Sequence, residues 1–138
     1  MSERVEKALE IYSTNSNCAQ ATLAAFLDLT ELDRETAFKI TAPMSRGIGG
    51  RRGICGALVG VIMAAGAVKG YDHDPHPYEK TEHLNFIAEI AKKFEERFGS
   101  SNCGILLEKN EADGLVNNPC SRYVQGAVEI LEELFLED

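Results

Sequence analysis

The chain has 138 residues, a length that suits one domain with a hydrophobic core of its own. Hydrophobic residues make up 44% of it, as in a soluble globular protein. The net charge is −8 at neutral pH, with 22 acidic against 14 basic residues. This acidic balance argues against nucleic acid or an anionic membrane as the main partner.

The first ten residues, MSERVEKALE, are charged and lack the apolar region of a signal peptide. The longest uncharged run, residues 53–68, is shorter than the ~20 residues that a membrane-spanning helix needs. We therefore expect a cytoplasmic protein without a membrane span. In that compartment structural disulfides are rare, so its four cysteines indicate metal or redox chemistry.

Apolar residues recur three and four positions apart along most of the chain, which is the spacing of one helix face. Helices are predicted over these segments: 5–12, 18–29, 34–41, 54–68, 81–98, 101–107 and 120–136. The segment 54–68 is apolar on every face, which predicts a buried central helix. No stretch predicts a strand. The expected fold is all-α: a single domain over residues 1–138, built as a bundle of five to seven helices around the central helix.

Two segments between the helices are predicted to be loops, 71–79 and 108–118. The first is followed closely by His83 and contains residue types that bind metals, namely Asp72, His73, Asp74 and His76. Because prolines stand at positions 75 and 77, we interpret this segment as an exposed, solvated turn.

The four cysteines share one local context. They are Cys18, Cys55, Cys103 and Cys120, and no two of them form a C-x-x-C pair. Each stands at the predicted start of a helix, after residues that favour such a start: Asn17, Gly53, Asn102 and the pair Asn118-Pro119. A helix N-terminus carries partial positive charge, which stabilises a thiolate and lowers its pKa. The pattern therefore predicts thiolate chemistry at all four positions.

One cysteine follows a loop rich in glycine and arginine, within SRGIGGRRGICGALVG at 45–60. The favoured interpretation is a tight glycine turn before the buried helix, with the arginines making the approach to Cys55 electropositive. An alternative is a small-anion site formed by Arg46, Gly47, Gly49, Gly50, Arg51, Arg52 and Gly53. Neither the P-loop nor the dinucleotide-binding spacing is present, so no nucleotide is expected.

The segment Cys55-Gly56-Ala57-Leu58-Val59-Gly60 matches a CGAxxG motif, with one cysteine before it and two after it. In this four-cysteine arrangement the chain resembles the C-GCAxxG-C-C family over nearly its whole length. The resemblance implies a small helical protein with a proposed redox role. The chain is also similar to part of the split-Soret cytochromes, for which a cysteine-bound iron–sulfur centre has been proposed. A C-x-x-C-H site is missing here, so no covalent haem is expected.

Two redox chemistries remain open from the residues. In the first, which is slightly favoured, all four cysteines bind an iron–sulfur cluster or a zinc ion. In the second, the four are redox thiols, with Cys55 as the attacking nucleophile and any of the others as the resolving partner. The small-anion site is a third, non-redox reading. We expect a redox partner of unknown identity, and the sequence leaves a homodimer open.

Overall fold

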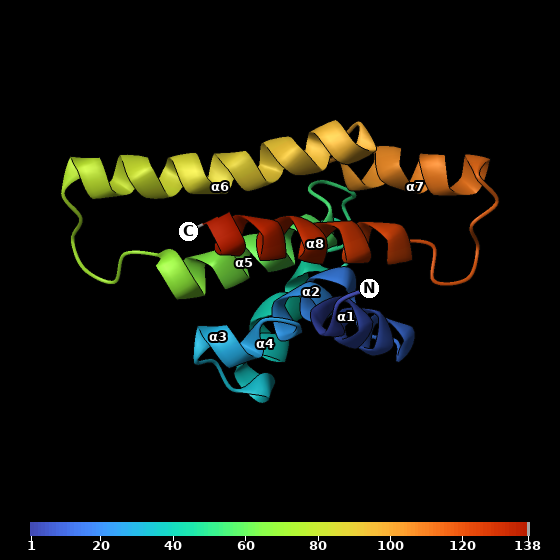
Figure 1. The fold of residues 1–138 in the computed structure, drawn as a ribbon. Coiled ribbons are helices and arrows are strands. Elements are labelled where there is room, and N and C mark those ends of the chain that lie inside the picture. Colours follow the sequence, from blue (N-terminus) through green and yellow to red (C-terminus); the bar gives the residue numbers. More distant parts are fainter. Residues whose placement is uncertain (138) are drawn as a thin grey trace.

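The computed structural model describes residues 1–137 (Figure 1). Its helices, in chain order, are α1 (Glu3–Ser13), α2 (Cys18–Ala24), α3 (Leu27–Thr30), α4 (Arg34–Thr41), a 3-10 turn η1 (Ala42–Met44), α5 (Gly56–Lys69), α6 (Pro77–Phe98), α7 (Cys103–Ala112) and α8 (Ser121–Glu137). Within residues 1–137 the only β contact is an isolated bridge between Ile54 and Asn102. The all-α prediction is confirmed.

The described residues form eight α-helices, one more than the largest number predicted. The extra helix arises because the predicted segment 18–29 is divided into α2 and α3. At Phe26 the backbone leaves helical geometry (φ −114°, ψ 16°), and its side chain is fully buried. The chain turns there, and the Phe26 ring packs in the core against Phe135.

Two other predicted boundaries are wrong. Helix α6 begins at Pro77, four residues before the predicted start, because proline suits the first helical position and His76 caps the helix. The His76 ring accepts a hydrogen bond from the Tyr78 N–H at 3.1 Å, and the Glu79 carboxylate accepts one from the His76 N–H at 3.1 Å. Helix α7 continues to Ala112 although the sequence there is polar, because the Asn110 side chain turns into the protein and is 1% exposed.

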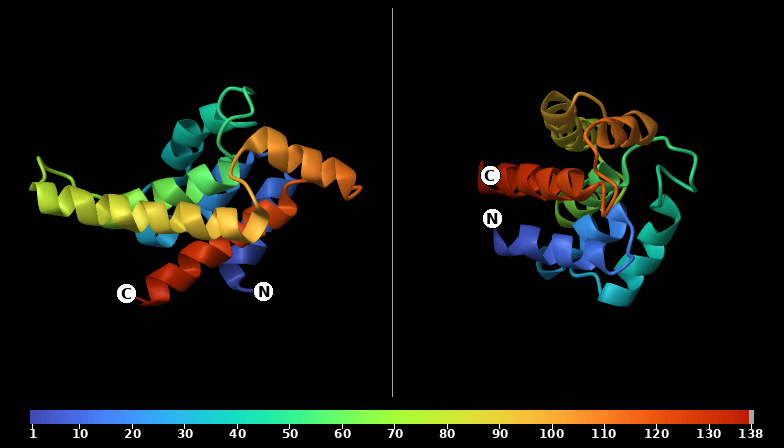
Figure 2. Two further views of the ribbon diagram at one scale, coloured as in Figure 1. Left: turned by 90° about the horizontal axis from the view of Figure 1, so that it is seen from above. Right: turned by 90° about the vertical axis from the view of Figure 1, so that its right-hand side faces the viewer.

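The helices lie in three tiers, with α5 and α8 side by side in the middle (Figure 1). Helices α6 and α7 lie on one side of this pair, and α1 to α4 lie on the other. The views in Figure 2 agree with this arrangement. Helix α5 packs against α2, α6 and α8, as predicted for a central apolar helix. No helix within residues 1–137 combines the length and the apolarity needed to cross a membrane.

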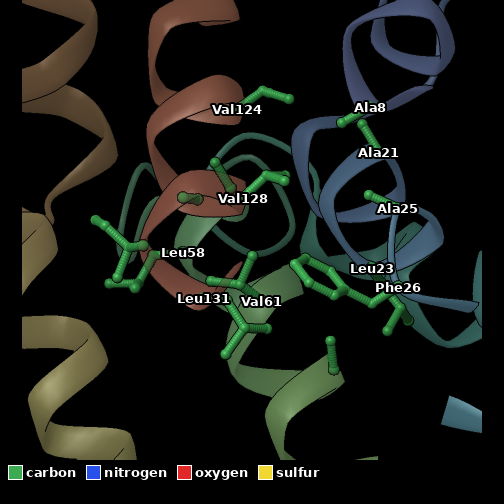
Figure 3. Close-up of a cluster of buried hydrophobic side chains, with 14 of the residues drawn as sticks. Ala8, Ala21, Leu23, Ala25, Phe26, Leu58, Val61, Val124, Val128 and Leu131 are labelled. Atoms are coloured by element: carbon green, nitrogen blue, oxygen red, sulfur yellow. The ribbon is translucent and has the colours of Figure 1, made fainter. Parts of the chain in front are cut away.

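The main core lies where α2, α5 and α8 meet (Figure 3). Its labelled side chains are Ala8, Ala21, Leu23, Ala25, Phe26, Leu58, Val61, Val124, Val128 and Leu131. Helices α2 and α5 approach most closely at Gly60, where an added Cβ would stand 1.9 Å from Thr22 Oγ1 and 2.5 Å from the Ala19 carbonyl oxygen. The Thr22 hydroxyl donates a hydrogen bond to the Ala57 carbonyl at 3.0 Å. This close crossing brings the N-terminal ends of α2 and α5 together.

Candidate functional site

Four helices begin around one cavity of about 430 Å³, and all four cysteines line it. Cys18 is the first residue of α2, and Cys103 is the first residue of α7. Cys55 caps the start of α5, and Cys120 directly precedes α8. The predicted placement at helix starts is therefore confirmed for each of them. The fold brings together thiols that lie up to 102 positions apart in the sequence.

Backbone hydrogen bonds hold the starts of α5 and α7 next to each other. The Cys55 N–H donates to the Ser101 carbonyl at 2.8 Å, and the Cys103 N–H donates to the Gly53 carbonyl at 2.6 Å. The Asn102 side chain adds a hydrogen bond from its amide to the Arg52 carbonyl at 3.2 Å. These contacts form the isolated bridge of the fold, and they fix Cys55 and Cys103 on the cavity wall.

A capping box fixes Cys18 at the start of α2. The Gln20 N–H donates to Asn17 Oδ1 at 2.8 Å, and the Asn17 N–H donates to Gln20 Oε1 at 3.0 Å. The glycine of the CGAxxG motif that follows Cys55 lies directly against Cys18. A Cβ added to Gly56 would stand 3.4 Å from the Cys18 Cβ. A Cβ at position 56 would therefore be in ordinary van der Waals contact with Cys18.

The sulfur of Cys120 receives more hydrogen bonds than the other three. The Cys18 thiol donates to it, and the Asn110 amide donates to it at 3.6 Å. The Tyr12 hydroxyl accepts the Cys120 backbone N–H at 3.3 Å and also hydrogen-bonds to the sulfur. The hydrogen bond from Cys18 contributes most, followed by those from Tyr12 and Asn110, and together they lower the pKa of Cys120 to about 7 against the opposing effect of burial. These hydrogen bonds therefore favour the thiolate form of Cys120.

The other three thiols have raised pKa values. The pKa of Cys18 lies well above its ordinary value, first because its proton is donated to Cys120 and second because it is buried. Burial raises the pKa of Cys55 to about 12, although the N–H groups of Leu58 and Ala57 oppose the shift. Burial also raises the pKa of Cys103. The prediction that its helix start makes Cys55 a thiolate is therefore wrong: desolvation outweighs the helix N-terminus there.

The family model described as "Putative redox-active protein (C_GCAxxG_C_C)" matches residues 16–134, a range that includes all four cysteines of the cavity. The chain belongs to this family. No curated protein and no solved structure gives a significant match. The predicted resemblance is confirmed, and with it a redox description at the level of the family.

The Gly/Arg loop of this C_GCAxxG_C_C member is a tight turn that contributes only part of its length to the cavity. Five consecutive residues, 46–50, have positive φ, between 52° and 76°. Gly47 requires glycine, because a Cβ there would stand 2.5 Å from the Gly53 nitrogen. Figure 2 shows the loop projecting from the helices close to α7.

Only part of the predicted anion-binding set lies at the cavity. Three of its seven residues line the cavity: Arg46, Gly47 and Arg52. The other four do not line it: Gly49, Gly50, Arg51 and Gly53. Of these four, Gly53 takes part in the bridge to Cys103.

The polar turn before α6 lies outside the cavity. His73 is 55% exposed at its side chain and pairs with Asp72 and Glu79, each at 3.0 Å. The interpretation of this segment as solvated is confirmed, although its last residues belong to α6. Among residues 1–137, no three side chains of His, Cys, Asp or Glu are placed to hold a metal ion.

Sequence reasoning missed two residues that act on Cys120. Tyr12 falls within the predicted helix 5–12, and Asn110 falls within the predicted loop 108–118. In the structure Asn110 is buried, and Arg122 holds its side chain by donating from Nε to Asn110 Oδ1 at 3.1 Å. Asn110 lies four positions after the buried Leu106, on the same helix face, but its polarity conceals this from the apolar pattern of the sequence.

Proposed function

We propose that this protein is a thiol–disulfide redox protein in which Cys18 and Cys120 alternate between a dithiol and a disulfide. The observations that carry the proposal are that Cys18 and Cys120 line one cavity and that hydrogen bonding between their side chains raises the pKa of Cys18 and lowers the pKa of Cys120. Two cysteines that interact in one cavity are candidates for a disulfide, whose formation requires adjacent sulfurs. The lowered pKa of Cys120 supports it as the attacking sulfur, in place of Cys55.

The reaction runs in two exchange steps. The Cys120 thiolate attacks one sulfur of a substrate disulfide, whose S–S bond breaks, and one substrate thiolate leaves. Cys18 then loses its proton to the departing thiolate and attacks the Cys120 sulfur of the mixed disulfide, which releases the second substrate thiolate. The protein dithiol loses two electrons and two protons, and the substrate disulfide becomes two thiols. Excess thiol of the same class runs the steps in reverse.

A neutral chromogenic disulfide, 4,4′-dithiodipyridine, tests this proposal. The reduced protein is expected to release two equivalents of thiopyridone rapidly. Cys120→Ser should lose the rapid phase, and Cys18→Ser should release one equivalent and retain a mixed disulfide on Cys120, which mass spectrometry identifies. Cys55→Ser and Cys103→Ser are matched controls that keep both steps. A rapid phase that survives in Cys120→Ser, or a mixed disulfide found on Cys55, contradicts the proposal.

A second candidate function is an iron–sulfur protein, because the cavity holds two more cysteines than exchange requires. Four thiolates are the ligand set of such a cluster, and four helix starts would offset its negative charge. When bound, a cluster would accept and return single electrons. A lone zinc ion fits less well, since no three candidate ligands among residues 1–137 are placed around one point.

Iron and sulfide analysis of protein purified without oxygen separates the two functions. A cluster protein would contain stoichiometric iron and sulfide and would lose them in each of the four Cys→Ser variants. A thiol-exchange protein would be free of iron, and its activity would depend on Cys18 and Cys120 alone. Dependence on Cys55 and Cys103 is therefore the discriminating result.

A further inference from the structure

The cavity wall contains two arginines whose positive charge the exchange reaction itself does not require. We infer that it selects small anionic disulfides and thiols, and that Arg46 and Arg52 bind their negative groups. This inference rests on the proposed exchange function for its reaction, but its charge preference can be measured separately.

The first observation is the composition of the wall. Of the 18 described residues that line the cavity, two are arginines and none is aspartate or glutamate. The chain as a whole has 22 acidic residues and a net charge of −8. A positive wall on a negative protein attracts an anion into this cavity in preference to the rest of the surface.

The second observation is that these two guanidinium groups have no ion-pair or hydrogen-bond partner among residues 1–137. Arg4, Arg97 and Arg122 each form an ion pair with a carboxylate. Within the described part of the chain, neither Arg46 nor Arg52 forms an ion pair or a side-chain hydrogen bond. Both are exposed and available to a ligand. A carboxylate can be bound by such a group through two parallel hydrogen bonds.

The third observation is the backbone that presents them. Arg46 and Arg52 have φ of 52° and 59°, a conformation that disfavours residues with a side chain. A hydrogen bond from the Arg52 N–H to the Arg46 carbonyl, at 3.0 Å, joins the two residues. Asn15 and Asn118, which also line the cavity, have positive φ as well. Four of the six non-glycine residues with positive φ among residues 1–137 therefore surround the cavity.

The position of the arginines relative to the thiols completes the argument. Arg52 lies against the start of α7, since a Cβ added to Gly104 would stand 3.6 Å from the Arg52 Cβ. Its charge also opposes the rise in the pKa of Cys103. The volume of about 430 Å³ is within the usual range for small-molecule sites. A small disulfide whose sulfur meets Cys120 can therefore place its anionic end on the arginines.

Three disulfides of similar size and different charge test the inference. They are 3,3′-dithiodipropionate, bis(2-hydroxyethyl) disulfide and cystamine, with charges of about −2, 0 and +2 at neutral pH from their carboxylate, hydroxyl and amine groups. The wild-type protein is expected to react with the anionic compound about tenfold faster than with the neutral one, and slowest with the cationic one. Added salt should reduce the difference.

The double variant Arg46→Gln/Arg52→Gln should lose this preference. Glutamine keeps a long side chain at each position and removes only the charge. Arg51→Gln is the matched control, because Arg51 is exposed in the same loop but does not line the cavity. Equal rates with the three disulfides in the wild type, or an unchanged order in the double variant, would overturn the inference.

Alkylation of Cys120 measures the same preference without any disulfide. The rate of alkylation by anionic iodoacetate is divided by the rate with neutral iodoacetamide, first for Cys120 and then for a free small thiol. The first ratio divided by the second measures the preference of the cavity for an anion. This normalised ratio should be above one in the wild type and in Arg51→Gln. It should fall to about one in the double variant. If this pattern holds while all three disulfides are inert, the exchange function fails and the anion preference stands. If the disulfides react and the ratio is one throughout, the preference fails and the exchange function stands.

Discussion

The unequal protonation of Cys18 and Cys120 follows from one shared proton. The Cys18 thiol donates to Cys120, so the charge that forms on the pair is held at Cys120. Tyr12 and Asn110 add hydrogen bonds to that same sulfur. A buried thiolate needs such donors, because removal from water alone raises its pKa, as Cys55 demonstrates.

Substitution of Cys18 tests this assignment through the pH dependence of Cys120 alkylation. The wild-type midpoint is expected at a pH of about 7. Cys18→Ala removes the main donor, so the pKa of Cys120 should rise towards its ordinary value of 9.0, and the midpoint should move to higher pH. Cys18→Ser retains a hydroxyl donor and should keep the midpoint near the wild-type value. A midpoint near 7 in Cys18→Ala would show that Cys18 does not set the protonation of Cys120.

The positions of the cysteines could be predicted from their neighbours, but their protonation states could not. Asn17 and Asn102 cap helices, and these local preferences place Cys18 and Cys103 at helix starts. Which thiol ionises depends on burial and on Tyr12, which lies 108 positions from Cys120. Such information exists only in the folded chain, so the sequence alone does not distinguish Cys120 from Cys55 in the ease of ionisation.

The crossing of α2 and α5 explains the last glycine of the CGAxxG motif. Gly60 faces backbone and side-chain atoms of α2 too closely for any Cβ. Gly66, six residues further along the same helix, has no atom within 4 Å of an added Cβ. The motif therefore combines two features. Cys55 stands at the start of α5, and Gly60 allows the close contact with α2 that holds this start beside Cys18.

Alanine substitutions at these two glycines should have opposite effects. Gly60→Ala is expected to lower the free energy of unfolding by about 1–3 kcal/mol, because α2 and α5 must separate. Gly66→Ala should raise it by about 0.5–1 kcal/mol, because alanine loses less backbone entropy in a helix. Urea unfolding of the two variants measures both changes. Similar values for the pair would mean that the helices do not cross closely at Gly60.

The helix boundaries were the least predictable part of the fold, and the physical reason differs from one boundary to the next. The start of α6 at Pro77 is a local preference that the sequence contains, since proline fits the first helical position. The break between α2 and α3 has no such local cause. Phe26, at the break, is buried and lies against the distant residue Phe135, whose ring centroid is 5.9 Å away.

Oxidation of the Cys18–Cys120 pair should affect the stability of the whole molecule. The bond would close a loop that includes most of the chain, from residue 18 to residue 120. A disulfide that closes a loop of about 100 residues lowers the conformational entropy of the unfolded chain. This should raise the free energy of unfolding by roughly 4–5 kcal/mol if the folded state accepts the bond without strain.

Urea unfolding of the oxidised and reduced forms tests this expectation. A Cys55→Ser/Cys103→Ser background leaves only the proposed pair to be oxidised. The oxidised form should be the more stable, and the gain in stability should make the disulfide correspondingly harder to reduce. An oxidised form that is less stable than the reduced one would show that the two sulfurs are not arranged for a bond.

The contact between the first and the last cysteine has a consequence for synthesis. Cys18 leaves the ribosome 102 residues before Cys120, a delay of about 5–20 s at ordinary rates of translation. During this interval Cys55 and then Cys103 are the only other thiols on the same chain. An oxidant that acts on the growing chain would join Cys18 to one of them, and that bond would have to be exchanged before the native cavity could form. Under the proposed exchange function, reducing conditions during synthesis would therefore favour correct pairing of Cys18 with Cys120.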